Sequence, residues 1–155
     1  YWLMEGYQLA CLRPYEPNKV QFRKGPGGKE LAYITARDVM DRLDEVFKPD
    51  GWQTRYDYIG GRMICYLSCK VKGEWITKAD GADDTQIEAA KGGISDSLKR
   101  AAVLWSIGRY LYYPGSFGSN RVPAHWATPE GFDKIWAARQ GKEIEKFRAE
   151  LGLVT

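Results

Sequence analysis

The chain has 155 residues, of which 44% are hydrophobic and 28% charged, and it carries a formal net charge of +3 at pH 7. This size is typical of one domain and this balance is typical of a soluble, folded protein, so an intrinsically disordered chain is excluded. No apolar run approaches the roughly 20 residues that a membrane-spanning helix needs. The first residues include Glu5 and lack a basic start, so they do not resemble a signal peptide. We therefore expect a cytoplasmic protein with no membrane partner.

A β-hairpin with a basic tip is the first predicted element. Residues 19–23 (KVQFR) alternate and are rich in strand formers, residues 24–29 (KGPGGK) are a turn signal, and residues 31–34 resume the extended pattern. Four cations occur here with no acid among them: Lys19, Arg23, Lys24 and Lys29. A nucleotide-binding P-loop is excluded, because its glycine spacing is absent and Glu30 stands where Ser or Thr is required.

A helix is predicted next. Thr35 precedes Asp38 by three residues in a pattern similar to a capping box. Apolar residues then recur at helical spacing, namely Met40, Leu43 and Phe47. The sequence Pro49-Asp50-Gly51 ends the helix.

Three strand-like runs follow, at residues 52–59, 63–71 and 74–78. Turn signals at residues 59–62 and at Lys72-Gly73 separate them, so they are predicted to form an antiparallel meander. Residues 80–84 are predicted as a polar loop.

A long amphipathic helix is predicted from Thr85 to about Tyr110. Its apolar stripe comprises Ile87, Ala90, Ile94, Leu98, Ala101 and Trp105. Gly92-Gly93 within it predicts a kink or a close backbone approach. Neighbouring helical positions point about 100° apart, so at least one of Lys99 and Arg100 is expected to flank the buried stripe.

The remainder of the chain is predicted as a loop over residues 113–126 and C-terminal helices over residues 128–152. Thr128 caps the first of these helices, Pro129 occupies its first turn, and Gly141 is a break. The elements together predict one α+β domain over residues 1–155, with a core at about 19–113 and the long helix packed on the sheet.

Scattered cysteines predict neither a disulfide framework nor a zinc site. Cys11, Cys65 and Cys69 are an odd set, and His125 is the only histidine. We therefore expect reduced cysteines and no metal.

Basic residues in the hairpin and at Lys99-Arg100 allow two interpretations: solvated surface charge, or contact with nucleic-acid phosphates. Aromatic side chains that could stack on bases, or belong to the core, are Tyr33, Tyr56, Tyr58, Trp75 and Tyr110.

A cluster of acids before the long helix supports a competing hypothesis, a metal-dependent nuclease. Carboxylates with a lysine can bind Mg²⁺ and polarise a phosphate. The residues are Asp80, Asp83, Asp84, Glu88 and Lys91. Acids near a helix start also serve as partners of the helix dipole.

A family resemblance favours nucleic-acid binding. Tyr33-Ile34, the helix ending before Gly51-Trp52, the meander and residues 91–101 (KGGISDSLKRA) resemble, in this order, the Rad52 family of single-strand annealing proteins. Residues 107–112 (IGRYLY) look most like its bacteriophage and prophage members, which implies the cytoplasm of a bacterial host.

The resemblance implies DNA binding without catalysis. Family members form a ring or short helical oligomer whose basic groove holds one DNA strand with its bases outward, so that a complementary strand pairs without ATP. No cofactor is implied. Candidate further partners are a recombinase or a single-strand binding protein; a third hypothesis is a structural or recombinase-loading protein that touches DNA incidentally.

Carried onto this chain, the resemblance implies groove contacts at Lys99 and Arg100, with Arg23 and Lys24 on the overhanging hairpin and Tyr33 at its foot. Eukaryotic members have an arginine where this chain has Val103. We expect Lys91 or Arg109 to supply the positive charge that is missing at Val103. Candidates for an outer DNA site are Lys72 and Lys78.

Overall fold

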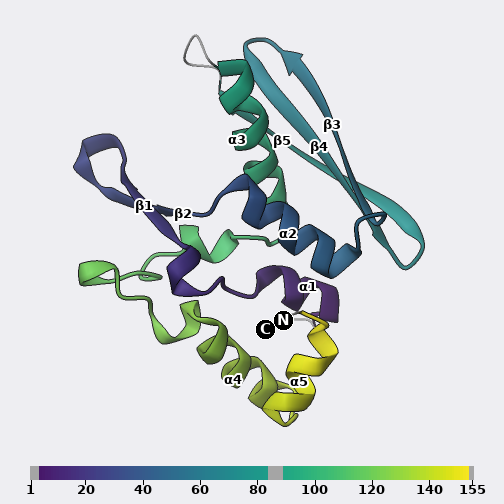
Figure 1. Ribbon diagram of the computed structural model, residues 1–155, viewed down its shortest axis with the longest axis vertical. Coiled ribbons are helices and arrows are strands. Elements are labelled where there is room, and N and C mark those ends of the chain that lie inside the picture. Colours follow the sequence, from purple (N-terminus) through teal and green to yellow (C-terminus); the bar gives the residue numbers. More distant parts are fainter. Residues whose placement is uncertain (1–3, 84–88, 154–155) are drawn as a thin grey trace. The chain divides into compact units, whose positions relative to one another are not determined.

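Two compact units make up the computed structural model, which describes residues 4–83 and 89–153. Unit 1 comprises Tyr1–Ile34 and Gly108–Thr155, and unit 2 comprises Thr35–Ile107. Unit 2 is therefore one continuous stretch, whereas unit 1 joins the two ends of the chain. The predicted α+β class is confirmed, with helices and two separate antiparallel sheets (Figure 1). The single domain over residues 1–155 stays a prediction.

Unit 2 contains the predicted helix, meander and long helix. The elements are α2 (Ala36–Phe47), β3 (Trp52–Ile59), β4 (Arg62–Val71), β5 (Glu74–Asp83) and α3 (Ala89–Leu104). The strands pair antiparallel in the order β3-β4-β5. Both predicted turns are present, and Gly60, Gly61, Lys72 and Gly73 adopt the left-handed conformation in them.

The capping box of α2 is confirmed. The Asp38 backbone N–H donates to Thr35 Oγ1 at 3.2 Å, and the Thr35 N–H donates to Asp38 Oδ2 at 3.0 Å. After the helix, Gly51 approaches the backbone so closely that an added Cβ would lie 1.8 Å from the Phe47 carbonyl oxygen. Glycine is therefore required where the chain turns from α2 into β3.

The core of unit 2 lies between the meander and α3, which runs along β4 and β5 (Figure 1). Alternate residues of β4, namely Cys65, Leu67 and Cys69, are fully buried. The ring centroids of Trp105 and Phe47 lie 5.5 Å apart, and Trp105 Nε1 donates to the Leu67 carbonyl at 3.2 Å. The indole therefore joins the core with its polar atom satisfied.

Helix α3 packs on the sheet through small residues. One position of its predicted apolar stripe, Ile94, is therefore wrong. Gly93, Ser97 and Ala101 recur every four residues and are all buried, and a Cβ on Gly93 would lie 3.1 Å from Met63 Cβ. The predicted close backbone approach is thus confirmed at Gly93. Because the contact is centred on these small residues, Ile94 falls to the edge and is 43% exposed, while Leu98 remains buried.

Two predicted boundaries are also wrong. The long helix ends at Leu104 rather than near Tyr110, because Ser106 and Gly108 have φ of 76° and 74° and turn the chain away. The predicted loop at residues 80–84 is strand up to Asp83, where β5 still pairs with β4. Residues 84–88 lie outside the description.

Within the described residues, unit 1 holds a short hairpin and three α-helices, with 3-10 helices in the connections. The elements are α1 (Gly6–Leu12), β1 (Gln21–Lys24), β2 (Glu30–Tyr33), α4 (Pro129–Arg139) and α5 (Ile144–Leu151). The predicted C-terminal helices are present, with Thr128 Oγ1 accepting from the Gly131 N–H at 3.1 Å. Helix α1 was not predicted, although the Glu5 N–H donates to Gln8 Oε1 at its start in a capping box.

A buried carboxylate joins the helices of unit 1. Asp133 is fully buried and accepts hydrogen bonds from Arg13 Nε at 2.9 Å, Arg13 Nη2 at 2.8 Å and Arg148 Nε at 2.7 Å. These bonds tie the segment after α1 to α4 and α5. In the described part of the chain, every helix is too short or too polar to span a membrane.

Candidate nucleic-acid interface

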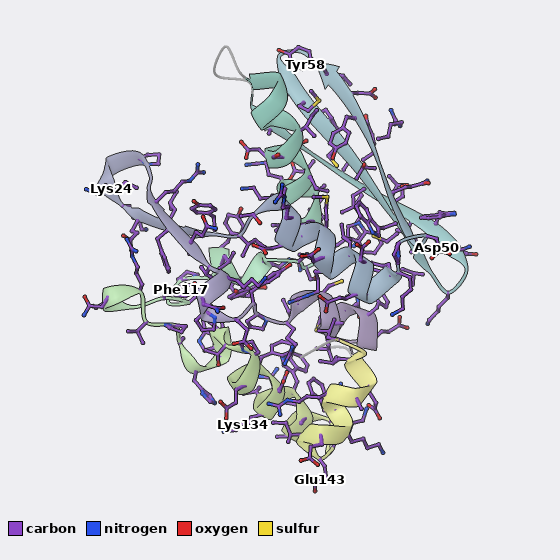
Figure 2. All side chains as sticks on the ribbon, viewed as in Figure 1. Lys24, Asp50, Tyr58, Phe117, Lys134 and Glu143 are labelled. Carbon is purple, nitrogen blue, oxygen red and sulfur yellow. The ribbon has the colours of Figure 1, made fainter. Side chains whose placement is uncertain are left out.

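The predicted basic hairpin is present, shifted by one or two residues. Its strands pair from Gln21 opposite Tyr33 to Lys24 opposite Glu30. The first strand begins at Gln21 because residues 17–19 form a 3-10 turn. Residues 26–28 make the reversal, and Figure 2 shows Lys24 at the outer part of the hairpin.

One face of the hairpin combines a cation with an aromatic ring. Alternation in the strands places Gln21, Arg23 and Tyr33 on the same face. The Arg23 guanidinium carbon lies 5.5 Å from the centroid of the Tyr33 ring, and Tyr33 Oη donates to Gln21 Oε1 at 3.0 Å. Arg23 is exposed to solvent. The structure therefore brings together two predicted site residues, an exposed cation and an aromatic ring.

The second face of the hairpin packs against the loop that follows residue 113. The Phe22 ring meets Phe117 edge-on, with centroids 5.2 Å apart. Figure 2 shows Phe117 beside the base of the hairpin. Lys24 also belongs to this face by register, and it is exposed. The hairpin is thus supported on one face within unit 1.

Lys99 and Arg100 lie at the solvent-facing margin of α3. Lys99 is half-buried, with its Nζ 3.9 Å from Asp96 Oδ1, and the Arg100 side chain is 55% exposed, with its Nε 3.9 Å from Asp80 Oδ1. Their neighbours Leu98 and Ala101 are buried. At these distances the acids balance the cations without tight hydrogen bonds. Both cations therefore lie beside the buried face of α3, and Arg100 is the more exposed of the two.

Two further predicted groove residues are Lys91 and Arg109. Lys91 belongs to α3, but its side chain lies outside the description. Arg109 opens a 3-10 helix in unit 1 and is half-buried. The hairpin residues belong to unit 1 and the α3 cations to unit 2.

The two outer-site candidates differ in their surroundings. Lys72 lies in the exposed turn between β4 and β5 with φ of 52°. The Lys78 ammonium donates to the Leu104 carbonyl at 3.2 Å and lies 4.6 Å from the centroid of the Trp105 ring. Lys78 thus places positive charge at the C-terminal end of α3, where the helix dipole favours it.

The acidic cluster gains no support as a metal site. Asp80 lies on β5, where its Oδ1 accepts from the Gly81 N–H at 2.7 Å and faces Arg100. Asp84 and Glu88 lie outside the described residues. Over residues 4–83 and 89–153, no group of three or more potential ligands is placed to hold a metal ion.

The aromatic candidates divide into core and surface. Tyr110 is buried, and its Oη accepts from the Tyr15 N–H at 3.1 Å. Tyr56 is half-buried, and burial raises the pKa of its hydroxyl to about 12. Tyr58 and Trp75 are largely exposed. Sequence reasoning overlooked Arg121, which donates hydrogen bonds to Glu30 of the hairpin from the predicted loop at residues 113–126.

Comparison with known proteins identifies the family. The profile of the Rad52/22 family double-strand break repair protein matches residues 5–65 and 66–117. The single-stranded DNA-binding protein DdrA of Deinococcus radiodurans is 32% identical over 134 residues, which cover 78% of this chain and 64% of the relative. The DdrA of Deinococcus deserti is 33% identical over 117 residues, which cover 70% of this chain and 58% of that protein.

The matched segment contains the hairpin, the meander and α3, and it extends toward the N-terminus through α1. The chain spans about three fifths of the length of these relatives. The predicted family resemblance is confirmed, whereas the closeness to phage members and the cytoplasmic location stay predictions. This chain belongs to the Rad52/22 family of double-strand break repair proteins.

Proposed function

We propose that this chain binds single-stranded DNA through its phosphates and anneals complementary strands without ATP, as a non-catalytic step of recombination and repair. The observation that carries the proposal is the placement of Lys99 and Arg100 on the solvent side of α3, directly beside its buried face. These residues lie within the segment that matches the family, and the relatives are named as single-stranded DNA-binding proteins.

Phosphate contact suits an annealing protein. Ammonium and guanidinium groups neutralise the backbone whatever the base sequence, so the strand is held while its bases remain available. Arg23 and Lys24 supply further exposed charge from the hairpin, with the Tyr33 ring beside Arg23. We also assign Lys91 and Arg109 to this contact, and Lys72 and Lys78 to a second DNA site.

Self-association follows from the small number of cations in one copy. Two residues on α3 and two on the hairpin neutralise few phosphates, so several copies are needed for tight binding. Strands β3 and β5 are the outer strands of the meander, and Trp75 and Ile76 on β5 are exposed. Open strand edges favour pairing with another copy. We propose a ring or helical homo-oligomer, visible by analytical ultracentrifugation at micromolar concentration, and a recombinase or single-strand binding protein as a further partner.

The experiment is an annealing assay with two labelled complementary strands, without ATP, in the presence and absence of Mg²⁺. We expect duplex to form at a rate above the spontaneous one, with strands of unchanged length, and scrambled sequences of equal length to behave alike. Shortened strands that require Mg²⁺ would instead support the nuclease hypothesis. Binding without faster annealing would restrict the protein to a DNA-binding or recombinase-loading role.

A further inference from the structure

We propose that Arg121 is a positioning residue of the DNA interface: it holds and neutralises Glu30, so that the hairpin presents positive charge to the DNA. The inference rests on the proposed function. It concerns a residue that lies beyond the segment matched by the family profile, which ends at residue 117.

Glu30 is the acid of the hairpin, and its position is unfavourable for binding a polyanion. Residues 19–33 contain four cations and this one carboxylate. The strand register places Glu30 directly opposite Lys24. A free carboxylate there would reduce the positive electrostatic potential around the exposed cations of the hairpin.

Arg121 pairs with this carboxylate in a two-point geometry. Its Nε donates to Glu30 Oε1 and its Nη2 to Glu30 Oε2, each at 2.9 Å. These hydrogen bonds hold the pKa of the Glu30 carboxyl below its usual range. The guanidinium carbon also lies 4.9 Å from the centroid of the Phe22 ring on the neighbouring strand.

The loop that carries Arg121 is built to hold it there. Phe117 and Pro123 form a bridge, and the Gly118 N–H donates to the Val122 carbonyl at 2.8 Å. Between them, Asn120 and Arg121 both adopt the left-handed conformation, with φ of 58° and 62°. Residues with a side chain adopt it at a cost, which persists only where the surroundings maintain it. The Phe117–Pro123 bridge and the Phe22–Phe117 contact are those surroundings.

Stability alone does not account for this arrangement. The Arg121 and Glu30 side chains are 57% and 43% exposed, and ion pairs this exposed contribute little to folding. We therefore expect Arg121→Gln to shift the melting temperature by no more than about 2 °C. Its effect should appear in DNA affinity instead.

The test is a double-mutant cycle with four proteins: the parent, Arg121→Gln, Glu30→Gln and the double variant. The measurement is the Kd for a fluorescently labelled oligo-dT strand at low salt. We expect Arg121→Gln to weaken binding about threefold by exposing the carboxylate charge. Glu30→Gln should bind more tightly than the parent, because the Arg121 charge is then uncompensated, and the double variant should bind like the parent, because both charges are removed together.

A matched control is Arg139→Gln. Arg139 is also exposed and stacked on a ring, 4.7 Å from the Trp136 centroid, but it lies in the last turn of α4. Its loss should leave Kd unchanged.

The cycle separates the proposal from its alternatives. A double variant that binds as weakly as Arg121→Gln would mean that the loss comes from a direct contact of Arg121 with DNA and not from the Glu30 charge, and it would overturn the positioning role. A Glu30→Gln variant as weak as Arg121→Gln would make the ion pair a structural brace and would also overturn it. A parent protein that fails to bind the strand would refute the proposed function, whereas a parent that binds with no effect of Arg121→Gln refutes this inference alone.

Discussion

Both compact units have apolar cores, and unit 1 adds a network of hydrogen bonds around a buried carboxylate. Unit 2 is one continuous stretch whose core is apolar, formed by alternate residues of β4 and the buried face of α3. Unit 1 joins both ends of the chain, and a buried carboxylate with two arginines links its helices. The candidate DNA-binding cations of α3 therefore lie outside the core of unit 2, whereas in unit 1 a charged group is itself part of the buried structure.

The largest effect on stability is expected at Asp133. Replacing it with Asn removes the buried charge that faces Arg13 and Arg148 and leaves two guanidinium groups uncompensated. We expect the free energy of unfolding to fall by about 3 kcal/mol, measured by urea denaturation. Glu130→Gln is the control on the same helix, because its pair with Lys134 is exposed and is expected to contribute about 0.5 kcal/mol or less. Equal losses of unfolding free energy in Asp133→Asn and Glu130→Gln would show that the buried Asp133 carboxylate does not stabilise unit 1.

An intermediate effect is expected where α3 approaches the meander. Gly93→Leu must displace Met63, since even a Cβ would lie 3.1 Å from Met63 Cβ. We expect a loss of about 1–3 kcal/mol in the free energy of unfolding from overpacking. Ser95→Leu, at an exposed position of the same helix, should change it by less than about 0.5 kcal/mol. If Gly93→Leu were as mild as Ser95→Leu, the small-residue contact would not define how α3 packs.

A smaller effect is expected at Lys78. Alanine at this position removes the ammonium from the Leu104 carbonyl and from the Trp105 ring. Loss of a cation at a helix C-terminus, together with the ring contact, should cost about 1 kcal/mol. Lys70→Ala is the control, because Lys70 lies farther from a ring, at 5.8 Å from the Trp75 centroid. Identical melting temperatures for Lys78→Ala and the parent would contradict a stabilising role of Lys78 at the end of α3.

The sequence predicted unit 2 better than unit 1, for a physical reason. The meander, its turns and the capping box of α2 depend on residues that are close in the chain, which local patterns report. The wrong position, Ile94, came from counting apolar residues, whereas the packing of α3 is set by Gly93, Ser97 and Ala101. A repeat of small residues every four positions was the available signal.

In unit 1 the decisive contacts join distant residues, which a single sequence does not display. Asp133 bonds Arg13 across 120 positions, and Arg121 bonds Glu30 across 91. Helix α1 did carry a local signal in Glu5 and Gln8. The exposed cations of the candidate site could be named from the family resemblance, but the neutralisation of Glu30 required the structure.

The most direct test of the central claim is the salt dependence of single-stranded DNA binding by the Lys99→Ala/Arg100→Ala double variant. Stability should change by less than about 0.5 kcal/mol, because both side chains lie at the margin of the core. Affinity should fall sharply, and the slope of log K against log salt should become shallower by about 1.4, the value for two lost phosphate contacts on a single strand. Lys134→Ala/Arg139→Ala, which removes two exposed cations from α4, should match the parent. A Lys99→Ala/Arg100→Ala variant that binds with the parent's affinity and slope would contradict the account.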